Sequence, residues 1–173
     1  MICYYLFKTA IGEAGFAVTP RGVCRVILPC LKPAVIGKQL RSACPEIASG
    51  SFPPPPLAQR FVESAKAYFL GRRVDFDLPL DLAGANEFEA KVYLALQKVK
   101  YGQVQTYGWL AEKVGAPGGA RAVGAALSQN PTPLLVPCHR IIRADGGLGG
   151  FSAAQGVKLK KWMLELEAKN KKE

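Results

Sequence analysis

Residues 106–128 read TYGWLAEKVGAPGGARAVGAALS, which predicts two short helices joined by a glycine-containing turn. Thr106 is a preferred N-cap for a helix over 107–114, and Gly115 is a preferred residue just past its end. Residues 120–128 predict the second helix, with three apolar side chains facing inward: Val123, Ala126 and Leu127. A helix, a short turn and a second helix form the helix-turn-helix pattern.

The outward face of the second helix carries small side chains and one arginine: Arg121, Gly124, Ala125 and Ser128. Small residues let a duplex backbone approach closely, but they also permit close helix packing, so this face alone leaves DNA binding open. The net charge of +10 favours a polyanionic partner, nucleic acid first. It fits a solvated basic face equally well.

Just downstream, Pro137-Cys138-His139-Arg140 holds the only histidine of the chain. An ordinary thiol has a pKa near 8.5 and is mostly protonated at neutral pH, and a nearby imidazole is the usual means of making it a thiolate. The pair also fits a structural cysteine beside a surface histidine. Leu134-Leu135-Val136 before it predicts a buried strand, and residues 140–143 predict a second short strand.

Two more helices are predicted in the second half. Asn86 and Glu89 have capping-box spacing, and four apolar residues recur after them at helical intervals: Phe88, Val92, Ala95 and Val99. The last helix is expected over 156–168, with an apolar stripe of Leu159, Trp162, Met163 and Leu166. Glu167 falls on the edge of that stripe, where most glutamates are merely solvated.

The first half predicts strands, short turns and two helices. Residues 2–7 and 22–28 predict strands, and residues 33–42 a short helix. Gly12, Gly15 and Pro20-Arg21-Gly22 are assigned to the turns between strands. A stiff proline-rich connector (49–56) leads to a helix with Leu57, Phe61, Ala65 and Phe69 on one face, closed by Gly71. Residues 76–82 predict an edge strand or an extended linker.

Composition bounds the class of protein. We expect a reduced cytosolic protein, because residues 1–7 do not form a secretory signal and no segment is long and apolar enough to cross a membrane. Cys3, Cys24, Cys30 and Cys44 form no CxxC pair, and a second histidine is absent, so we expect no metal site.

Five blocks of the second half together resemble the O6-alkylguanine-DNA alkyltransferase family, the methylated-DNA–protein-cysteine methyltransferases. These blocks are residues 101–107, 120–124, 130–140, 147–152 and 162–167, with further likeness at 68–73 and 78–82. The resemblance covers roughly residues 60–168. It implies two subdomains: an RNase H-like α/β part over 1–80, and a mostly helical part over 81–168 with a winged or plain helix-turn-helix, followed by a tail over 169–173.

The resemblance implies irreversible, stoichiometric transfer of an alkyl group from O6-alkylguanine in duplex DNA to Cys138, with the base flipped out of the helix. O4-alkylthymine is a second conceivable substrate. No metal or organic cofactor is needed, since DNA is the alkyl donor. A cytoplasmic, nucleoid-associated monomer is implied.

The resemblance also implies a role for each active-site residue. Cys138 is the nucleophile, His139 its general base through water, and Glu167 the group that orients and stabilises His139. Asn130 ties the preceding chain to the active-site loop. Tyr107 presses on the target phosphate and donates a proton to the leaving guanine.

The DNA contacts implied by the family motifs are Arg121, Ala120, Ala122, Gly124, Ser128 and Thr106. Arg121 fills the gap left by the flipped base, and the second helix enters the minor groove, since it has little charge and many small residues. The implied base pocket consists of Leu127, Val136, Ile141, Gly149, Phe151, Ser152 and Ala153.

The chain departs from the family pattern at a few positions. Phe151 stands where tyrosine is frequent, and Ala153 stands where glycine is common, which is expected to narrow the pocket. Trp109 is expected in the core or near DNA. Two rival functions stay open: a Cys-His-Glu hydrolase, and a lesion-binding or regulatory helix-turn-helix protein in which Cys138 is structural.

Overall fold

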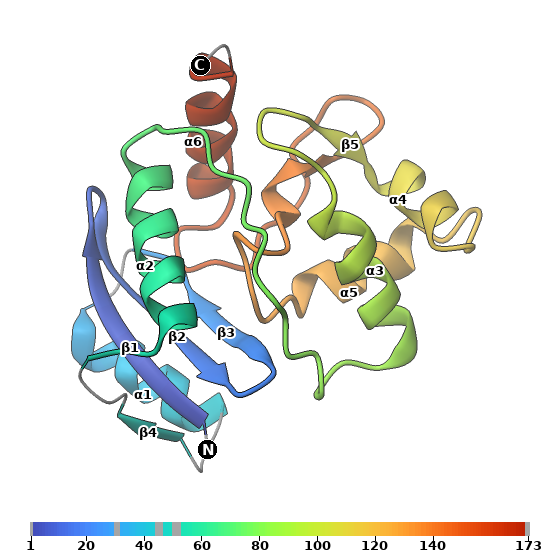
Figure 1. Ribbon diagram of the computed structural model, residues 1–173. Coiled ribbons are helices and arrows are strands. Elements are labelled where there is room, and N and C mark those ends of the chain that lie inside the picture. The colour runs from blue at the N-terminus through green and yellow to red at the C-terminus, as the bar shows by residue number, and fades with distance from the viewer. Residues whose placement is uncertain (1, 30–31, 44–46, 50–52, 172–173) are drawn as a thin grey trace. The chain divides into compact units, whose positions relative to one another are not determined.

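The structure, a computed structural model, describes residues 2–29, 32–43, 47–49 and 53–171 (Figure 1). Its contacts divide the chain into two compact units. The first contains residues 1–81 and a returning segment, 131–135. The second contains residues 82–130 and 136–173. Together the described residues form a mixed α/β protein with a sheet and six α-helices.

The first unit is built on a four-stranded sheet with the order β3-β2-β1-β4. Strands β1 (Ile2–Thr9), β2 (Gly12–Thr19) and β3 (Gly22–Ile27) are antiparallel neighbours, and the short β4 (Ile47–Ser49) runs parallel to β1. The strands predicted at 2–7 and 22–28 are thus confirmed. Strand β4 was not predicted, because a strand of only three residues has too short a pattern to be recognised.

Each face of strand β2 packs against a helix. Ala17 packs with the buried side chains of α1 (Pro33–Ala43), and the Phe16 ring centroid lies 4.4 Å from that of Phe61 on α2 (Pro56–Phe69). Gly15, which we assigned to a turn, lies inside the strand. A Cβ there would come within 2.5 Å of Ile36 on α1, so the glycine is explained by close helix packing rather than by a turn.

Three other predictions for the first unit are met in the described residues. The two helices expected there are α1 and α2, and Gly71 follows α2 with a φ of 86°, a conformation that favours glycine. Residues 76–82 are extended, and the backbone on either side of Leu80 bonds to Val23 of β3. Of the proline-rich connector, residues 50–52 lie outside the described part of the chain.

The segment that returns to the first unit corrects one prediction. Leu134 and Leu135 are buried, but with Val136 they form a turn and not a strand. Prolines at 131, 133 and 137 lack the backbone N–H that a strand would use in pairing, and Leu134 adopts a φ of 78°.

The second unit is helical apart from a two-stranded parallel pair, β5 (Gln105–Thr106) and β6 (Ile141–Ile142). Its α-helices are α3 (Glu87–Gln97), α4 (Tyr107–Lys113), α5 (Ala120–Ser128) and α6 (Gly156–Lys169). Both capping-box bonds of α3 are present, and the Thr106 hydroxyl caps α4 as predicted. The inner face of α3 differs from the expected one, because Tyr93 and Leu96 are buried while Phe88 and Ala95 are half-buried.

A short 3-10 helix, η1 (Cys138–Arg140), precedes β6. It replaces the start of the strand that we expected over 140–143, so only Ile141 and Ile142 pair with β5. The turn at Cys138–Arg140 matters for the site because it lets consecutive side chains point in directions that an extended strand does not allow.

The described residues contain no helix long and apolar enough to cross a membrane. Within those same residues, no three histidine, cysteine, aspartate or glutamate side chains gather where they could hold a metal ion. Cys30 and Cys44, which we considered as ligands, lie outside the described ranges.

Candidate active site

Cys138 lies at the start of η1, and Asn130 contacts both its side chain and the turn that precedes it. The Asn130 amide Nδ2 donates to Cys138 Sγ at 3.2 Å and to the Val136 carbonyl at 2.9 Å. The Cys138 backbone N–H donates to the same Val136 carbonyl at 2.7 Å. One amide therefore holds both the thiol and the turn that presents it, which supports the predicted tie between Asn130 and the active-site loop.

The next residue pairs with the last helix. His139 Nε2 lies 2.7 Å from Glu167 Oε1 of α6, and both side chains are 1% exposed. The glutamate that the sequence placed at the edge of an apolar stripe is therefore fully buried. The backbone N–H of Gly102 also donates to Glu167 Oε2, at 2.9 Å.

Arg140, for which no role was predicted, completes this network. Its Nε lies 3.0 Å from Glu167 Oε2 and its Nη2 lies 3.0 Å from Oε1, a bidentate ion pair buried on both sides. Its Nη1 donates to the Val99 carbonyl at 2.6 Å, and the guanidinium carbon lies 5.8 Å from the Tyr101 ring centroid. Cys138, His139 and Arg140 are adjacent in sequence, but the pairing of Arg140 with Glu167 joins residues 27 positions apart and is evident only in the structure.

The ionisation states of this network follow from its contacts. Burial raises the pKa of Glu167, but the hydrogen bond to His139 and the ion pair with Arg140 outweigh it and bring that pKa to about 2. Burial lowers the pKa of His139, so the imidazole is neutral. An ionised carboxylate only accepts hydrogen bonds, so Nε2 carries the imidazole proton and Nδ1 carries the lone pair that can act as a base.

Burial disfavours ionisation of the Cys138 thiol. Burial raises the pKa of Cys138, while the Asn130 hydrogen bond and the positive charge of Lys160 act in the opposite direction. At rest the site thus contains a protonated thiol beside a neutral imidazole. A neutral imidazole is a base that can take up a thiol proton during the reaction, so the resting site need not store a reactive thiolate.

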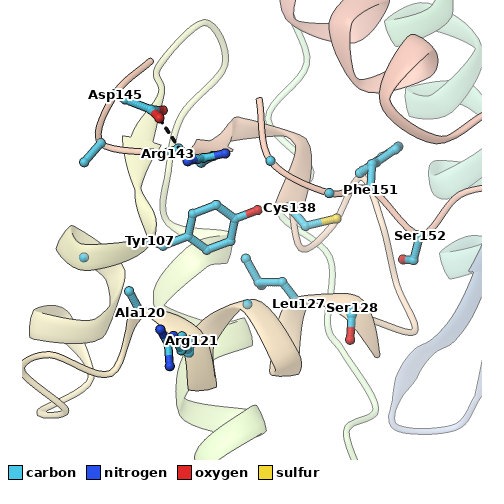
Figure 2. Close-up of a pocket in the computed structure, with 15 residues that line it drawn as sticks. Tyr107, Ala120, Arg121, Leu127, Ser128, Cys138, Arg143, Asp145, Phe151 and Ser152 are labelled. Carbon is cyan, nitrogen blue, oxygen red and sulfur yellow. Dashed lines mark ion pairs between the residues drawn. The ribbon is translucent and has the colours of Figure 1, made fainter. Parts of the chain in front are cut away.

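Cys138 opens onto a cavity of about 780 Å³ within the second unit (Figure 2). One wall is α5, with Arg121, Leu127 and Ser128, and Tyr107 of α4 projects its hydroxyl toward Cys138. The loop after β6 supplies the remaining wall, including Phe151 and Ser152. The lining is largely apolar, as expected of a site for a flat aromatic ligand.

The structure brings many of the predicted site residues to this cavity. Those that line it are Tyr107, Ala120, Arg121, Gly124, Leu127, Ser128, Cys138, Gly149, Phe151 and Ser152. Thr106, Ala122 and Ala153 are outside the lining, and Val136 and Ile141 are fully buried without contributing to it. The pocket roles of Val136, Ile141 and Ala153 and the DNA contacts of Thr106 and Ala122 stay predictions, as do the roles of the residues that line the cavity. Trp109 is half-buried, with the Lys113 ammonium 5.7 Å from its ring centroid.

Gly149 lies so close to Tyr107 that a side chain at position 149 would collide with the Tyr107 ring. Gly149 has a φ of 70°, and a Cβ there would lie 2.7 Å from Tyr107 Oη. Burial raises the pKa of Tyr107, and a negative charge on Cys138 raises it further. The phenol therefore keeps its proton and is available as a donor at the mouth of the site.

The cavity wall formed by the loop after β6 contains an ion pair that was not predicted. Arg143 Nη2 lies 3.0 Å from Asp145 Oδ2, and both side chains are more than half exposed. The Gly147 backbone N–H donates to Asp145 Oδ1 and fixes the turn. Arg121 and Arg143 thus lie on opposite sides of Tyr107, as Figure 2 shows.

Comparison with known proteins places this geometry in a family. Residues 87–169 match the family model of the 6-O-methylguanine DNA methyltransferase DNA-binding domain. A methylated-DNA–protein-cysteine methyltransferase of Mycolicibacterium paratuberculosis is 47% identical over 109 residues, which are 63% of this chain and 64% of that protein. The chain thus aligns with slightly less than two thirds of this relative.

Two further relatives align over nearly their whole length. A DNA base-flipping protein of Thermus thermophilus is 42% identical over 92% of this chain and 95% of its own. The crystal structure of the Mycobacterium tuberculosis O6-methylguanine methyltransferase has a TM-score of 0.76 and 32% identity, covering 98% of this chain and 94% of that one. The M. tuberculosis protein has also been crystallised in complex with DNA, at a TM-score of 0.78 and 31% identity over 97% and 94% of the chains.

Proposed function

The chain belongs to the O6-methylguanine-DNA methyltransferase family, and on that premise we propose that it repairs DNA by transferring an alkyl group from guanine O6 to its own Cys138. The observation that carries this proposal is the buried Cys138, His139 and Glu167 set, with the thiol opening onto a cavity large enough for a base. The alkyl donor is the DNA, so the reaction uses no further cofactor.

The transfer is a single displacement. His139 Nδ1 takes the thiol proton through a water molecule, and the imidazolium is stabilised by Glu167. The Sγ electron pair then forms a bond to the alkyl carbon, and the bond from that carbon to O6 breaks with its electron pair going to guanine. The guanine anion takes a proton from the Tyr107 hydroxyl, which burial keeps protonated until then. The thioether product is stable, so each protein acts once.

The target base must leave the duplex for this chemistry. Guanine O6 lies within a base-paired stack, and extruding the nucleotide costs a few kcal/mol, less for a poorly paired damaged base. Arg121 lies on the exposed side of α5 at the mouth of the cavity, where it can fill the gap in the stack. Base flipping is also the named property of the Thermus thermophilus relative.

Helices α4 and α5 act as the helix-turn-helix that meets double-stranded DNA, with the β5–β6 pair as a candidate wing. The exposed surface of α5 consists mostly of small residues and carries Arg121 and Ser128. Such a surface suits contact with the DNA backbone in the minor groove better than recognition of base edges. We assign phosphate contacts to Thr106, Ala120, Ala122, Gly124 and Ser128.

The base pocket is assigned to Leu127, Gly149, Phe151 and Ser152, with Val136, Ile141 and Ala153 behind or beside them. Phe151 offers an apolar ring face and Ser152 a hydroxyl that can bond to the base edge. O4-alkylthymine is proposed as a secondary substrate, since the cavity of about 780 Å³ has room for a pyrimidine.

The finer features of the fold and setting also belong to this proposal. An RNase H-like first unit is supported by the strand order β3-β2-β1-β4, with β4 parallel to β1. We propose that the protein acts as a monomer in the cytoplasm, on the nucleoid.

A lesion-recognition protein is the strongest rival, since one relative is named only for base flipping. Such a protein needs no nucleophile, whereas here Asn130 and His139 position and serve a thiol at the cavity. A cysteine hydrolase is the other rival. It forms an intermediate that water cleaves to regenerate the thiol, whereas the thioether formed by alkyl transfer is not hydrolysed, so the two reactions differ in whether the protein turns over.

The test is to mix the protein with a duplex containing one O6-methylguanine and to measure the modified base after digestion of the DNA. We expect loss of one O6-methylguanine per protein molecule and then no further reaction. The Cys138→Ser variant is expected to bind the lesion but leave it intact. Continued turnover would support the hydrolase, and binding without loss of the lesion in both proteins would support the recognition protein.

A further inference from the structure

Lys160 of α6 is a buried cation that the reaction proposed above does not use. Its side chain is fully buried, and its Nζ donates to the Ile141 carbonyl at 2.6 Å and to the Gly150 carbonyl at 3.4 Å. The Nζ also lies 5.9 Å from the ring centroid of Tyr107. Among the described residues, its partners do not include a carboxylate.

The buried groups around Cys138 carry a net positive charge when Lys160 is protonated. The Glu167 carboxylate is matched by the Arg140 guanidinium, which it holds in a bidentate pair. His139 is neutral at rest, and Tyr107 and Tyr93 keep their protons because burial raises the pKa of each. Burying an ammonium without an opposite charge is unfavourable, so the site is built for an anion that the resting protein does not contain.

We propose that Lys160 is a positioning residue for the transfer reaction: its ammonium supplies the counter-charge for the Cys138 thiolate, and its two hydrogen bonds hold the walls of the base pocket. This inference rests on the proposed function, since it concerns the same thiol. It explains why α6 carries two buried charged residues, Lys160 and Glu167, which are two helical turns apart.

The electrostatics of the pair agree with this geometry. Burial lowers the pKa of Lys160 to about 8, and a charge on Cys138 acts against that decrease. Lys160 in turn opposes the effect of burial on Cys138. The thiolate and imidazolium formed by proton transfer would then each face an opposite charge, Lys160 and Glu167 respectively.

A purely structural role is the alternative, in which Lys160 only ties the carbonyls of Ile141 and Gly150 together. Two substitutions separate the roles. Lys160→Gln removes the charge but keeps an N–H donor, while Lys160→Met removes both. Lys161→Met is the matched control, because Lys161 is an exposed neighbour on the same helix.

The readout is the rate at which iodoacetamide alkylates Cys138 from pH 6 to 10, followed by mass spectrometry of the Cys138 peptide. This assay requires no DNA repair, so it is independent of the proposed function. We expect the rate profile to move to higher pH in both Lys160 variants, with reactivity at pH 7 about tenfold lower, as a change of one pH unit in the thiol pKa requires. If Lys160→Gln keeps the wild-type profile, the counter-charge role is wrong.

A second measurement keeps the inference testable if the variants do not fold. The titration of Lys160 is followed by NMR of the lysine side chains in the wild-type protein, before and after Cys138 is capped with iodoacetamide. Capping removes the thiolate, so the pKa of Lys160 is expected to decrease. Identical titration curves would show that the two groups do not interact and would overturn the proposal. Failure of alkyl transfer from DNA, with these results intact, would instead overturn the proposed function.

Discussion

At the scale of residues, the site combines an ion-pair network around Glu167 with a buried cation, Lys160, whose hydrogen-bond partners in the described residues are backbone carbonyls. The sequence indicated Cys138 and His139 through their adjacency and Glu167 only through the family resemblance, and the roles of all three stay predictions. It missed Arg140 and Lys160 as site residues, because lysine and arginine are exposed by default and only tertiary structure shows that these two are buried. The same reasoning undervalued Glu167, whose position at the edge of a stripe gave no sign of full burial.

Glu167→Gln is expected to slow alkyl transfer by at least about 100-fold, since the imidazolium loses its partner. It should also lower the free energy of unfolding by about 3 kcal/mol, because Arg140 is left as an unpaired buried charge. Single-turnover kinetics and urea denaturation measure the two effects. Glu165→Gln, an exposed change on the same helix, serves as the control. An unchanged transfer rate in a folded Glu167→Gln protein would remove Glu167 from the mechanism.

Asp145→Asn is expected to tighten DNA binding, because it releases Arg143 for a phosphate contact beside the cavity. One added contact should steepen the plot of log affinity against log salt concentration by about 0.9. The measurement is fluorescence anisotropy with unmodified duplex from 50 to 200 mM salt. The double variant Arg143→Ala, Asp145→Asn is the control and should show no gain. A gain of the same size in the double variant would mean that Arg143 does not touch DNA.

At the scale of elements, capping signals predicted helix starts well. The Asn86–Glu89 box and the Thr106 cap depend on residues within one turn, and both are present as expected. Predictions that depend on distant partners did less well. Gly15 lies inside a strand because α1 packs on it, and Leu134–Val136 is a turn because its neighbouring prolines lack pairing donors.

The loop after β6 offers a test of how the cavity is shaped. Gly149→Ala is expected to reduce alkyl transfer about 100-fold, since the new Cβ would displace the Tyr107 hydroxyl. Gly146→Ala is a matched control, because its φ of 83° imposes a similar backbone strain while its Cβ would meet nothing within 4 Å. Comparable transfer rates in the two variants would show that the Gly149–Tyr107 contact does not position Tyr107.

At the scale of the whole molecule, the first unit is not continuous in sequence, because a segment of the second half of the chain returns to it. Residues 131–135 join the first unit, where the Pro131 carbonyl accepts a hydrogen bond from Val26, and the chain then re-enters the second unit directly before the active-site turn. Local sequence patterns gave no sign of this return, because they do not encode contacts between residues about a hundred positions apart.

Stability should depend on pH through a single histidine. Burial lowers the pKa of His139, so as pH falls from 7 to 5 the unfolded chain takes up a proton that the folded protein does not. The free energy of unfolding is therefore expected to decrease toward pH 5, with a slope of up to about 1.4 kcal/mol per pH unit. A further decrease is expected between about pH 4.5 and pH 2, as the Glu167 carboxylate is protonated.

Urea denaturation at each pH measures this dependence, with His139→Gln as the control that should be nearly flat between pH 7 and 5. A wild-type protein with constant stability over that range would show that folding does not lower the pKa of His139. A stability that rises toward pH 5 would show that His139 is protonated in the folded state, and it would then not be the base of the resting site.

The central claim is that the alkyl group ends on Cys138, and the intact mass of the protein tests it most directly. The protein is mixed with duplex DNA containing one O6-methylguanine, weighed by mass spectrometry and mapped by peptide digestion. We expect a stable gain of about one methylene mass on the peptide containing Cys138, at one group per protein. An unchanged mass in a protein that binds the lesion tightly would contradict it.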